Sequence, residues 1–127
     1  MRIAKYILDV LPLPAFFFEL ETRRFLAANV RLLDLLGYST VELLGMTVDQ
    51  IQPREDLQRL ENALQSYPPE GATERRYLRK DGSLLYVRIL YRNNELVEDG
   101  IRRCARLVVV ESWGERPTQS AQQSFSE

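Results

Sequence analysis

Residues 29–45 constrain the fold of this chain more strongly than any other segment. Apolar residues recur at helical spacing on both sides of Gly37, so the segment predicts two short helices separated by this glycine. Asn29 is suited to cap the first helix. Ser39 and Glu42 have the spacing of a capping box at the start of the second helix. The middle of the chain is therefore predicted to be helical.

Strand patterns flank this helical region on both sides. Before it, a run of phenylalanines and a second short apolar run predict two strands that are joined by a polar turn. After it, β-branched and aromatic residues with partial alternation predict three more strands. The sequence Lys80-Asp81-Gly82-Ser83 is typical of a tight turn between two of these. The five expected strands are residues 14–20, 24–28, 73–79, 84–92 and 103–113.

Further helices complete the predicted order. Residues 1–11 carry an apolar stripe at helical spacing and end at a proline, residues 48–51 predict a short helix, and a longer helix begins near Pro53. Helices placed between two sets of antiparallel strands predict an α+β domain, with the helices packed on one face of the sheet. We divide the chain into an amphipathic N-terminal helix (1–12), a domain (13–113) and a polar tail or truncated linker (114–127).

The composition narrows the class of function. A chain of 127 residues with a net charge of −1 fits one domain and has no general electrostatic attraction to nucleic acid or to a lipid surface. No apolar run is long enough to span a bilayer, and the single cysteine, Cys104, suits a reducing compartment, so we expect a cytoplasmic domain without membrane contact. Histidine is absent, which removes the commonest general base, zinc ligand and haem ligand. We therefore expect neither an enzyme nor a metal site.

Several of these motifs together resemble the PAS family of sensory domains. The resemblance extends over most of the chain, up to the last predicted strand. It implies a PAS-like antiparallel sheet of five strands, with a helical cradle on one face and the amphipathic helix ahead of it. The motifs that carry it are Asn29, the sequence Gly37-Tyr38-Ser39, Glu42, Leu43, Gly45, Pro53 and the turn from Arg79 to Ser83.

The resemblance also implies a function. Such a domain is a sensory input module of bacterial signalling, which senses a small ligand or a partner and transmits a conformational change through a homodimer. Its effector, such as a kinase or cyclase domain, is attached covalently or non-covalently. A ligand-free module that only dimerises is the alternative. The sequence departs from the family at its end, where Ser112-Trp113-Gly114 stands in place of the Asp-Ile-Thr that many relatives carry before the output domain.

The family resemblance places any ligand pocket between the sheet and the helices. Residues 47–52 lack the cysteine that a light-oxygen-voltage photosensor needs for its flavin, and the absence of histidine excludes haem bound through that residue. The sequence does not exclude a pocket for non-covalent flavin or a small organic ligand. The alternative is that the same side chains fill an ordinary core without a pocket. The expected lining residues are Phe16, Phe18, Leu33, Leu36, Ile51, Leu57, Leu60, Tyr77, Val87, Ile89, Leu107 and Val109.

Three polar side chains are candidates for orienting a ligand in such a pocket: Tyr77, Arg88 and Tyr91. Because side chains alternate along a strand, Arg88 and Tyr91 lie on opposite faces, and only one of them can face the pocket. We expect Val87 and Ile89 on the inner face, which is a prediction from parity.

Charged residues elsewhere favour ordinary structural roles. Glu55 and Asp56 begin the long predicted helix, where adjacent side chains diverge and acidic groups suit the positive end of the helix dipole better than catalysis. Arginines concentrate on the last three strands, and nearby acidic residues favour a solvated sheet face over a phosphate or RNA surface. They are Arg75, Arg76, Arg79, Arg88, Arg92, Arg102, Arg103 and Arg106.

The N-terminal helix is the expected dimerisation element. Its apolar stripe must be covered, either by the sheet of its own domain or by a partner chain, and both alternatives stay open. The family resemblance favours a homodimer in which this helix packs on the outer sheet face. The expected interface consists of Ile3, Ile7, Val10 and Leu11 on the helix and Leu90, Val108, Val110 and Trp113 on the sheet.

Overall fold

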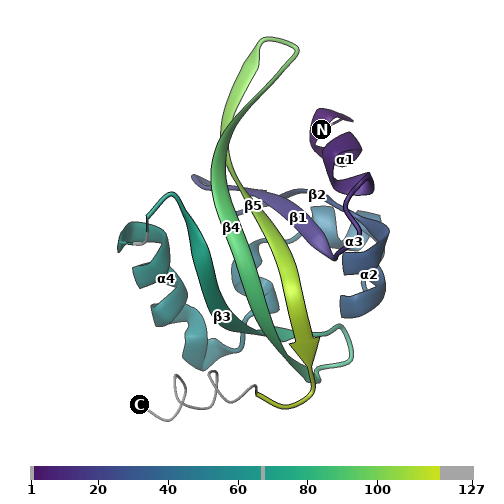
Figure 1. Cartoon of the computed structure of the whole chain (residues 1–127), viewed down its shortest axis with the longest axis vertical. Coiled ribbons are helices and arrows are strands. Elements are labelled where there is room, and N and C mark those ends of the chain that lie inside the picture. The colour runs from purple at the N-terminus through teal and green to yellow at the C-terminus, as the bar shows by residue number, and fades with distance from the viewer. Residues whose placement is uncertain (1, 67, 118–127) are drawn as a thin grey trace.

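A five-stranded antiparallel sheet forms the centre of the computed structural model, which describes residues 2–66 and 68–117 (Figure 1). The strand order is β2-β1-β5-β4-β3, so the first hairpin lies beside the last strand. β1 pairs with both β2 and β5, which joins the two ends of the chain in one sheet. The predicted α+β architecture is confirmed. The strands are β1 (Ala15–Glu19), β2 (Phe25–Ala28), β3 (Glu70–Leu78), β4 (Leu84–Glu98) and β5 (Ile101–Gly114).

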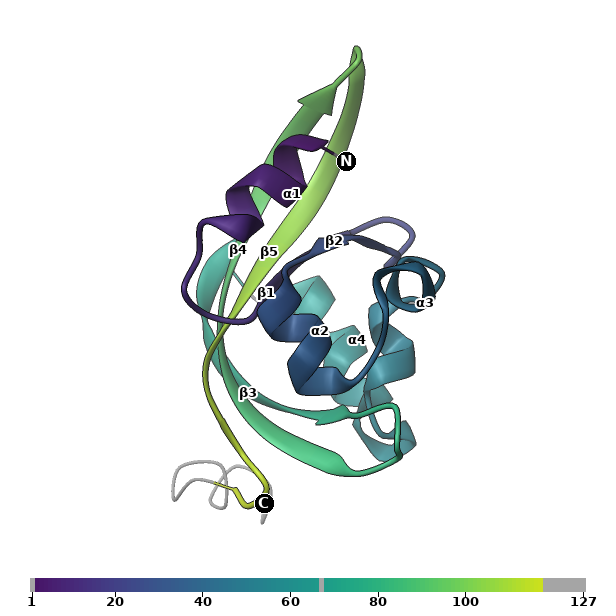
Figure 2. The ribbon, with the colours of Figure 1, turned by 90° about the vertical axis from the view of Figure 1, so that its right-hand side faces the viewer.

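Helices cover the two faces of this sheet unequally. The helices between β2 and β3 lie on one face and form the cradle, whereas the N-terminal helix lies on the other face (Figure 2). Each face has its own cluster of buried apolar residues. The N-terminal helix is α1 (Arg2–Asp9), and the cradle consists of α2 (Val30–Leu36), α3 (Thr40–Leu44), the short 3-10 helices η1 (Val48–Ile51) and η2 (Arg54–Asp56), and α4 (Leu57–Ser66).

The start of the cradle is fixed by the side chains that the sequence singled out. The backbone N–H of Leu32 donates to Asn29 Oδ1 at 3.1 Å, so Asn29 caps α2 as predicted. Gly37 ends α2 with a φ of 86°, which a residue with a Cβ rarely adopts. Ser39 and Glu42 exchange the two hydrogen bonds of a capping box at the start of α3. Local sequence thus determines both helices.

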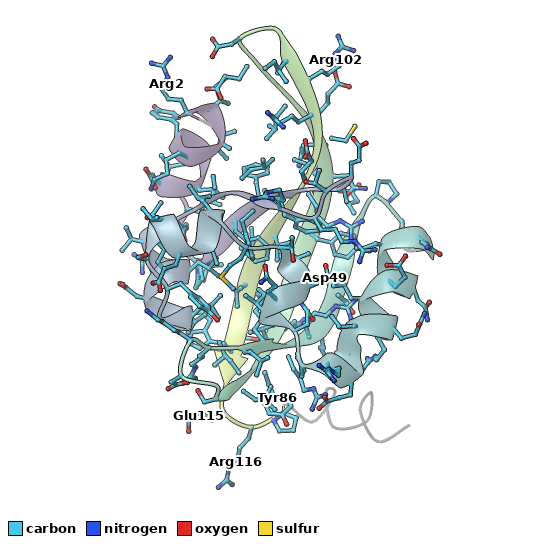
Figure 3. All side chains as sticks on the ribbon, turned by 180° about the vertical axis from the view of Figure 1, so that it is seen from behind. Arg2, Asp49, Tyr86, Arg102, Glu115 and Arg116 are labelled. Carbon is cyan, nitrogen blue, oxygen red and sulfur yellow. The ribbon has the colours of Figure 1, made fainter. Side chains whose placement is uncertain are left out.

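The hairpin between β4 and β5 is longer than predicted. The two strands continue to Glu98 and from Ile101, and the two-residue turn between them has φ values of 52° at Asp99 and 76° at Gly100. Figure 3 shows Arg102 at this projecting end and Arg116 at the opposite end of the molecule. The hairpin supports α1, because Glu98 Oε1 accepts a hydrogen bond from the backbone N–H of Arg2 at 2.9 Å.

The facing of β5 corrects the sequence prediction. Val108 and Val110 are buried on the cradle side, whereas Leu107 and Val109 pack on the side of α1. The predicted pocket positions of Leu107 and Val109 and the predicted outer positions of Val108 and Val110 were therefore wrong. The reason is physical: residues 107–110 are all apolar and both faces of this central strand are covered, so the sequence contains no alternation that fixes the facing.

The N-terminal helix packs on the sheet of its own domain. Ala4 and Leu8 are fully buried against a small cluster that includes Phe17 and Leu96. Within α1 these two residues make the contact, whereas Ile3 is 48% exposed and Val10 is 69% exposed. Of the predicted stripe, Leu11, which follows the helix, packs partly buried against the same cluster. Within residues 2–66 and 68–117, no helix has the length and apolar character needed to cross a membrane. Most of the predicted polar tail, residues 118–127, lies outside the described residues.

Candidate ligand cavity

A small cavity lies between the cradle and the sheet, where the sequence predicted a pocket. Its volume is about 30 Å³. This is room for roughly two water molecules, whereas pockets for drug-sized ligands hold roughly 300–1,000 Å³. A flavin would therefore require the cradle to move away from the sheet. The apolar part of the lining consists of Phe16, Phe18, Val48, Leu60, Ala63, Leu64, Ile89 and Val108.

The predicted lining residues divide into three groups. Five of them line the cavity, namely Phe16, Phe18, Leu60, Tyr77 and Ile89. Four others belong to the same apolar core without lining the cavity: Leu36, Ile51 and Val87 are buried, and Leu33 packs against them. Three do neither, because Leu57 is half-buried at the start of α4 and both Leu107 and Val109 lie on the opposite face of the sheet.

Aromatic side chains form the floor of the cavity on the sheet. The rings of Phe16 and Tyr77 meet edge to face with their centroids 6.3 Å apart, and Phe25 contacts Phe16 from the other side at 5.1 Å. Tyr77 is fully buried, and burial raises the pKa of its phenol well above the usual range. This hydroxyl therefore stays protonated over the physiological pH range.

Two buried arginines distinguish this cavity from an ordinary core. Arg75 on β3 and Arg106 on β5 both line it, and each is only 6% exposed. The predicted solvated face is therefore wrong for these two arginines. Both lie at positions with the same parity as inward-facing neighbours, Tyr77 on β3 and Val108 on β5. Their burial can therefore be predicted from the sequence only when it is known which face of each strand points toward the cradle.

Arg106 is surrounded by neutral groups. Its Nε donates to Asn93 Oδ1 at 2.7 Å, and its guanidinium carbon lies 4.5 Å from the centroid of the Tyr91 ring. Within residues 2–66 and 68–117 it forms no ion pair. Burial lowers the pKa of Arg106, and the positive charge of Arg75 lowers it further while Tyr91 opposes the shift.

Tyr91 and Arg88 lie on opposite faces of β4, as the alternation of side chains along a strand predicted, and only one of them faces the cavity. Tyr91 is buried and lines the cavity, whereas Arg88 is exposed on the other face. The guanidinium of Arg88 lies 3.6 Å from Glu74 and 3.4 Å from Glu111. The outer face of the sheet thus carries the charge pairing that the sequence predicted for the arginines as a group.

Ion pairs fasten the cradle to the sheet around the cavity. Arg76 on β3 binds Asp56 through two hydrogen bonds of 2.9 and 2.6 Å, and Glu55 approaches the same guanidinium at 3.3 Å. The hydrogen bond to Asp56 raises the pKa of Arg76, so it stays charged. Arg23 connects η1 and α4 in the same way, through Asp49 at 3.1 Å and through Glu61. Glu55 and Asp56 therefore have a structural role.

Gln52 is a polar cavity residue that sequence reasoning missed. It follows η1, is 6% exposed, and lines the cavity together with Thr73. Its Oε1 atom is buried and has no hydrogen-bond partner among the described residues. A buried amide oxygen without a partner is energetically unfavourable, because it has lost water and gained nothing in exchange. The cavity thus combines two arginines, three hydroxyl-bearing side chains (Thr73, Tyr77 and Tyr91) and an unsatisfied amide inside an apolar shell.

Comparison with known proteins identifies the class of this domain. Residues 25–107 match the family model described as the PAS fold, so the chain belongs to the PAS family. No curated protein matches the sequence significantly.

Solved structures agree with this assignment. A PAS domain from a two-component sensor histidine kinase has a TM-score of 0.65 at 22% identity, over 87% of this chain and 95% of that one. A domain of a sensory box sensor histidine kinase/response regulator from Geobacter sulfurreducens has a TM-score of 0.66 at 17% identity, over 87% and 92%. The LOV protein of Rhodobacter sphaeroides has a TM-score of 0.67 at 13% identity, over 86% and 64%. At these identities the likeness shows the fold alone.

Proposed function

We propose that this PAS domain is the sensory input module of a signal-transduction protein and binds a small ligand in the cavity between cradle and sheet. The observation that carries the proposal is the polar lining of the cavity. Arg75, Arg106 and Gln52 are buried in a cavity lining that is otherwise mostly apolar. Polar groups of this kind fix the orientation of a ligand, and the Gln52 oxygen without a partner among the described residues costs stability.

The signal passes from the cavity to the outer face of the sheet through β5. Arg106 faces the cavity, and its neighbours Ala105 and Leu107 pack on the side of α1. A ligand that pulls Gln52 toward Arg106 shifts the cradle relative to this strand, and α1 senses the shift through Leu8. In this proposal the domain catalyses no reaction, lies in the cytoplasm, and controls an effector such as a kinase or cyclase domain.

The exposed face of α1 supports a homodimer as the form in which the signal is transmitted. Ile3, Ile7 and Val10 remain exposed after α1 has packed on its own sheet, and Leu90 exposes apolar surface on the sheet. Apolar surface of this kind is stabilised by a partner. Trp113 is 47% exposed, but it lies opposite the inward-facing Val87 and beside α2, so its predicted place on the outer face is wrong. A ligand-free dimerisation module is the second candidate function, and the small volume of the cavity favours it.

Native mass spectrometry of the protein purified without added ligand tests the proposal, together with an absorbance spectrum. We expect a bound mass beyond that of the chain, or a gain of such mass and a rise in melting temperature when a metabolite library is added. A dimer without extra mass that no library member stabilises would favour the second candidate and contradict ligand sensing. A monomer that binds a ligand would contradict only the homodimer.

A further inference from the structure

We propose that the cavity binds a small planar monoanion, with a short-chain carboxylate such as formate or acetate as its ligand class, between the guanidinium groups of Arg75 and Arg106 and the amide of Gln52. This inference rests on the proposed function, since it names the ligand of the same cavity. Two observations carry it, namely the charge of the lining and the volume of the cavity, and the position of Gln52 adds a candidate donor from the cradle.

The charge of the lining selects an anion. Arg75 and Arg106 place two positive groups at one buried cavity, close enough for Arg75 to disfavour the charged form of Arg106. Arg106 contacts a neutral amide, that of Asn93, and an aromatic ring, that of Tyr91. A buried cation is costly unless an opposite charge compensates it. An anion in the cavity supplies that charge, whereas a neutral or cationic ligand does not.

The volume of the cavity selects a small ligand. About 30 Å³ accommodates roughly two water molecules, which restricts the ligand to very few non-hydrogen atoms. Formate, with three such atoms, is nearest to this size, and acetate, bicarbonate and nitrate, with four, need a slight widening of the cavity. Larger dicarboxylates require displacement of the cradle. A guanidinium group presents its N–H donors as a planar fork that matches two oxygens of a planar anion, so the shape also favours a carboxylate over a spherical halide.

The position of Gln52 completes the site from the cradle. Its amide has an oxygen without a partner among residues 2–66 and 68–117. Because an anion needs a donor, in this proposal the amide presents its NH2 group to the ligand and turns its oxygen away from it. Apolar side chains such as Phe18 and Leu60 line the remaining wall and suit the methyl group of acetate. The ligand therefore connects the sheet, through two arginines, with the cradle, through one glutamine.

Equilibrium dialysis of the full chain against radiolabelled acetate tests the inference directly. We expect one acetate per chain, displaced by unlabelled formate and nitrate and not by an equal concentration of sodium chloride. Equal displacement by chloride would show a halide site, and no binding above that of an unrelated protein would overturn the inference. Competition by bicarbonate against formate then identifies which planar anion fits best.

Variants locate the bound anion. Arg106→Met removes the charge while keeping a long apolar side chain, and we expect its affinity for acetate to fall at least about tenfold. Gln52→Leu is expected to weaken binding less. The matched control is Arg92→Met, an exposed arginine of β4, which leaves binding unchanged. Equal acetate affinity in wild type, Arg106→Met and Gln52→Leu would overturn the assignment of the site. If Arg106→Met does not fold by circular dichroism, Arg106→Lys replaces it, with the same expected direction.

Failure of this inference is distinguishable from failure of the proposed function. If native mass spectrometry finds a bound molecule that is not an anion, ligand sensing stands and the monoanion is overturned. If the protein binds neither acetate nor any library compound, both are overturned. If acetate binds but changes neither the melting temperature nor the stability of the dimer, the anion site is confirmed and its role in signalling is contradicted.

Discussion

The guanidinium carbon of Arg106 lies 4.5 Å from the centroid of the Tyr91 ring, with the two residues on neighbouring strands of the sheet. A cation above an aromatic face is stabilised by the negative charge density of the ring. Tyr91 thus holds Arg106 in the cavity and offsets part of the cost of its burial. This contact explains how a charged side chain persists in the interior of the domain.

Replacing Tyr91 tests this contact. We expect Tyr91→Leu to lower the free energy of unfolding by about 2 kcal/mol, because it removes both the ring packing and the cation–π contact. Tyr91→Phe keeps the ring over Arg106 and is expected to cost under ~1 kcal/mol. Urea unfolding measures both values. Equal losses in the two variants would contradict a role of the ring face in holding Arg106.

The Arg76–Asp56 ion pair provides a second prediction about the attachment of the cradle. Asp56 is buried and binds Arg76 through two oxygens, so we expect Asp56→Asn to destabilise the domain by about 2–3 kcal/mol. Glu55→Gln is the matched control. Glu55 is largely exposed and 3.3 Å from the same guanidinium, and its loss should cost under ~0.5 kcal/mol. If unfolding experiments give both variants the same stability, the bidentate pair does not hold the cradle.

The Glu42–Lys80 ion pair gives a prediction about pH. A 2.7 Å contact with Lys80 Nζ, together with the capping hydrogen bonds from Ser39, lowers the pKa of Glu42 from 4.5 to about 2. Because folding lowers this pKa, the stabilisation is fully present above about pH 4.5 and is lost as the pH falls toward 2. An NMR titration of the Glu42 carboxyl should show this low pKa.

Lys80→Met is the variant that isolates this effect. It is expected to raise the pKa of Glu42 toward its ordinary value, because the contact with Lys80, which lowers this pKa most, is removed while the capping box remains. Glu42→Gln has no carboxyl group to protonate at this position. Its free energy of unfolding should therefore fall less between pH 5 and pH 2 than that of the wild type. An unchanged pKa in Lys80→Met would mean that the capping hydrogen bonds alone hold the carboxylate.

The sequence predicted the local structure of the cradle well because short-range chemistry determines it. The Asn29 cap, the break at Gly37 and the capping box of Ser39 depend on residues only a few positions apart. The same holds for the turn at Asp81, whose Oδ1 accepts hydrogen bonds from the N–H and the hydroxyl of Ser83. The sequence Asp99-Gly100 is equally typical of a two-residue hairpin turn, but the predicted strands ended at residue 92 and began at residue 103, so the prediction did not use it.

The facing of β5 and the content of the cavity depend on long-range packing and were not predictable in this way. Residues 107–110 are apolar throughout, so only the helices that cover the two faces decide which side chains point where. Arg75 and Arg106 resemble surface arginines in the sequence, and tertiary packing brings both to one cavity. Gln52 has no local signal at all, since its burial follows from the position of η1 against the sheet.

The exposed face of α1 gives the last prediction, which concerns assembly. Deleting residues 1–11 would uncover Phe17 and Leu96 and destabilise the sheet, so point substitutions separate the two roles of the helix more cleanly. Ile7→Lys combined with Val10→Lys leaves the buried contacts of Ala4 and Leu8 intact. We expect this variant to keep its melting temperature and to raise the dimer dissociation constant at least about tenfold, an effect of about 1.4 kcal/mol. Val41→Lys is the matched control, because this residue is 84% exposed and belongs to α3, which lies in the cradle rather than beside α1 on the sheet (Figure 2). Light scattering across a concentration series measures both variants, and a dimer that persists unchanged in the double variant would place the interface on another surface.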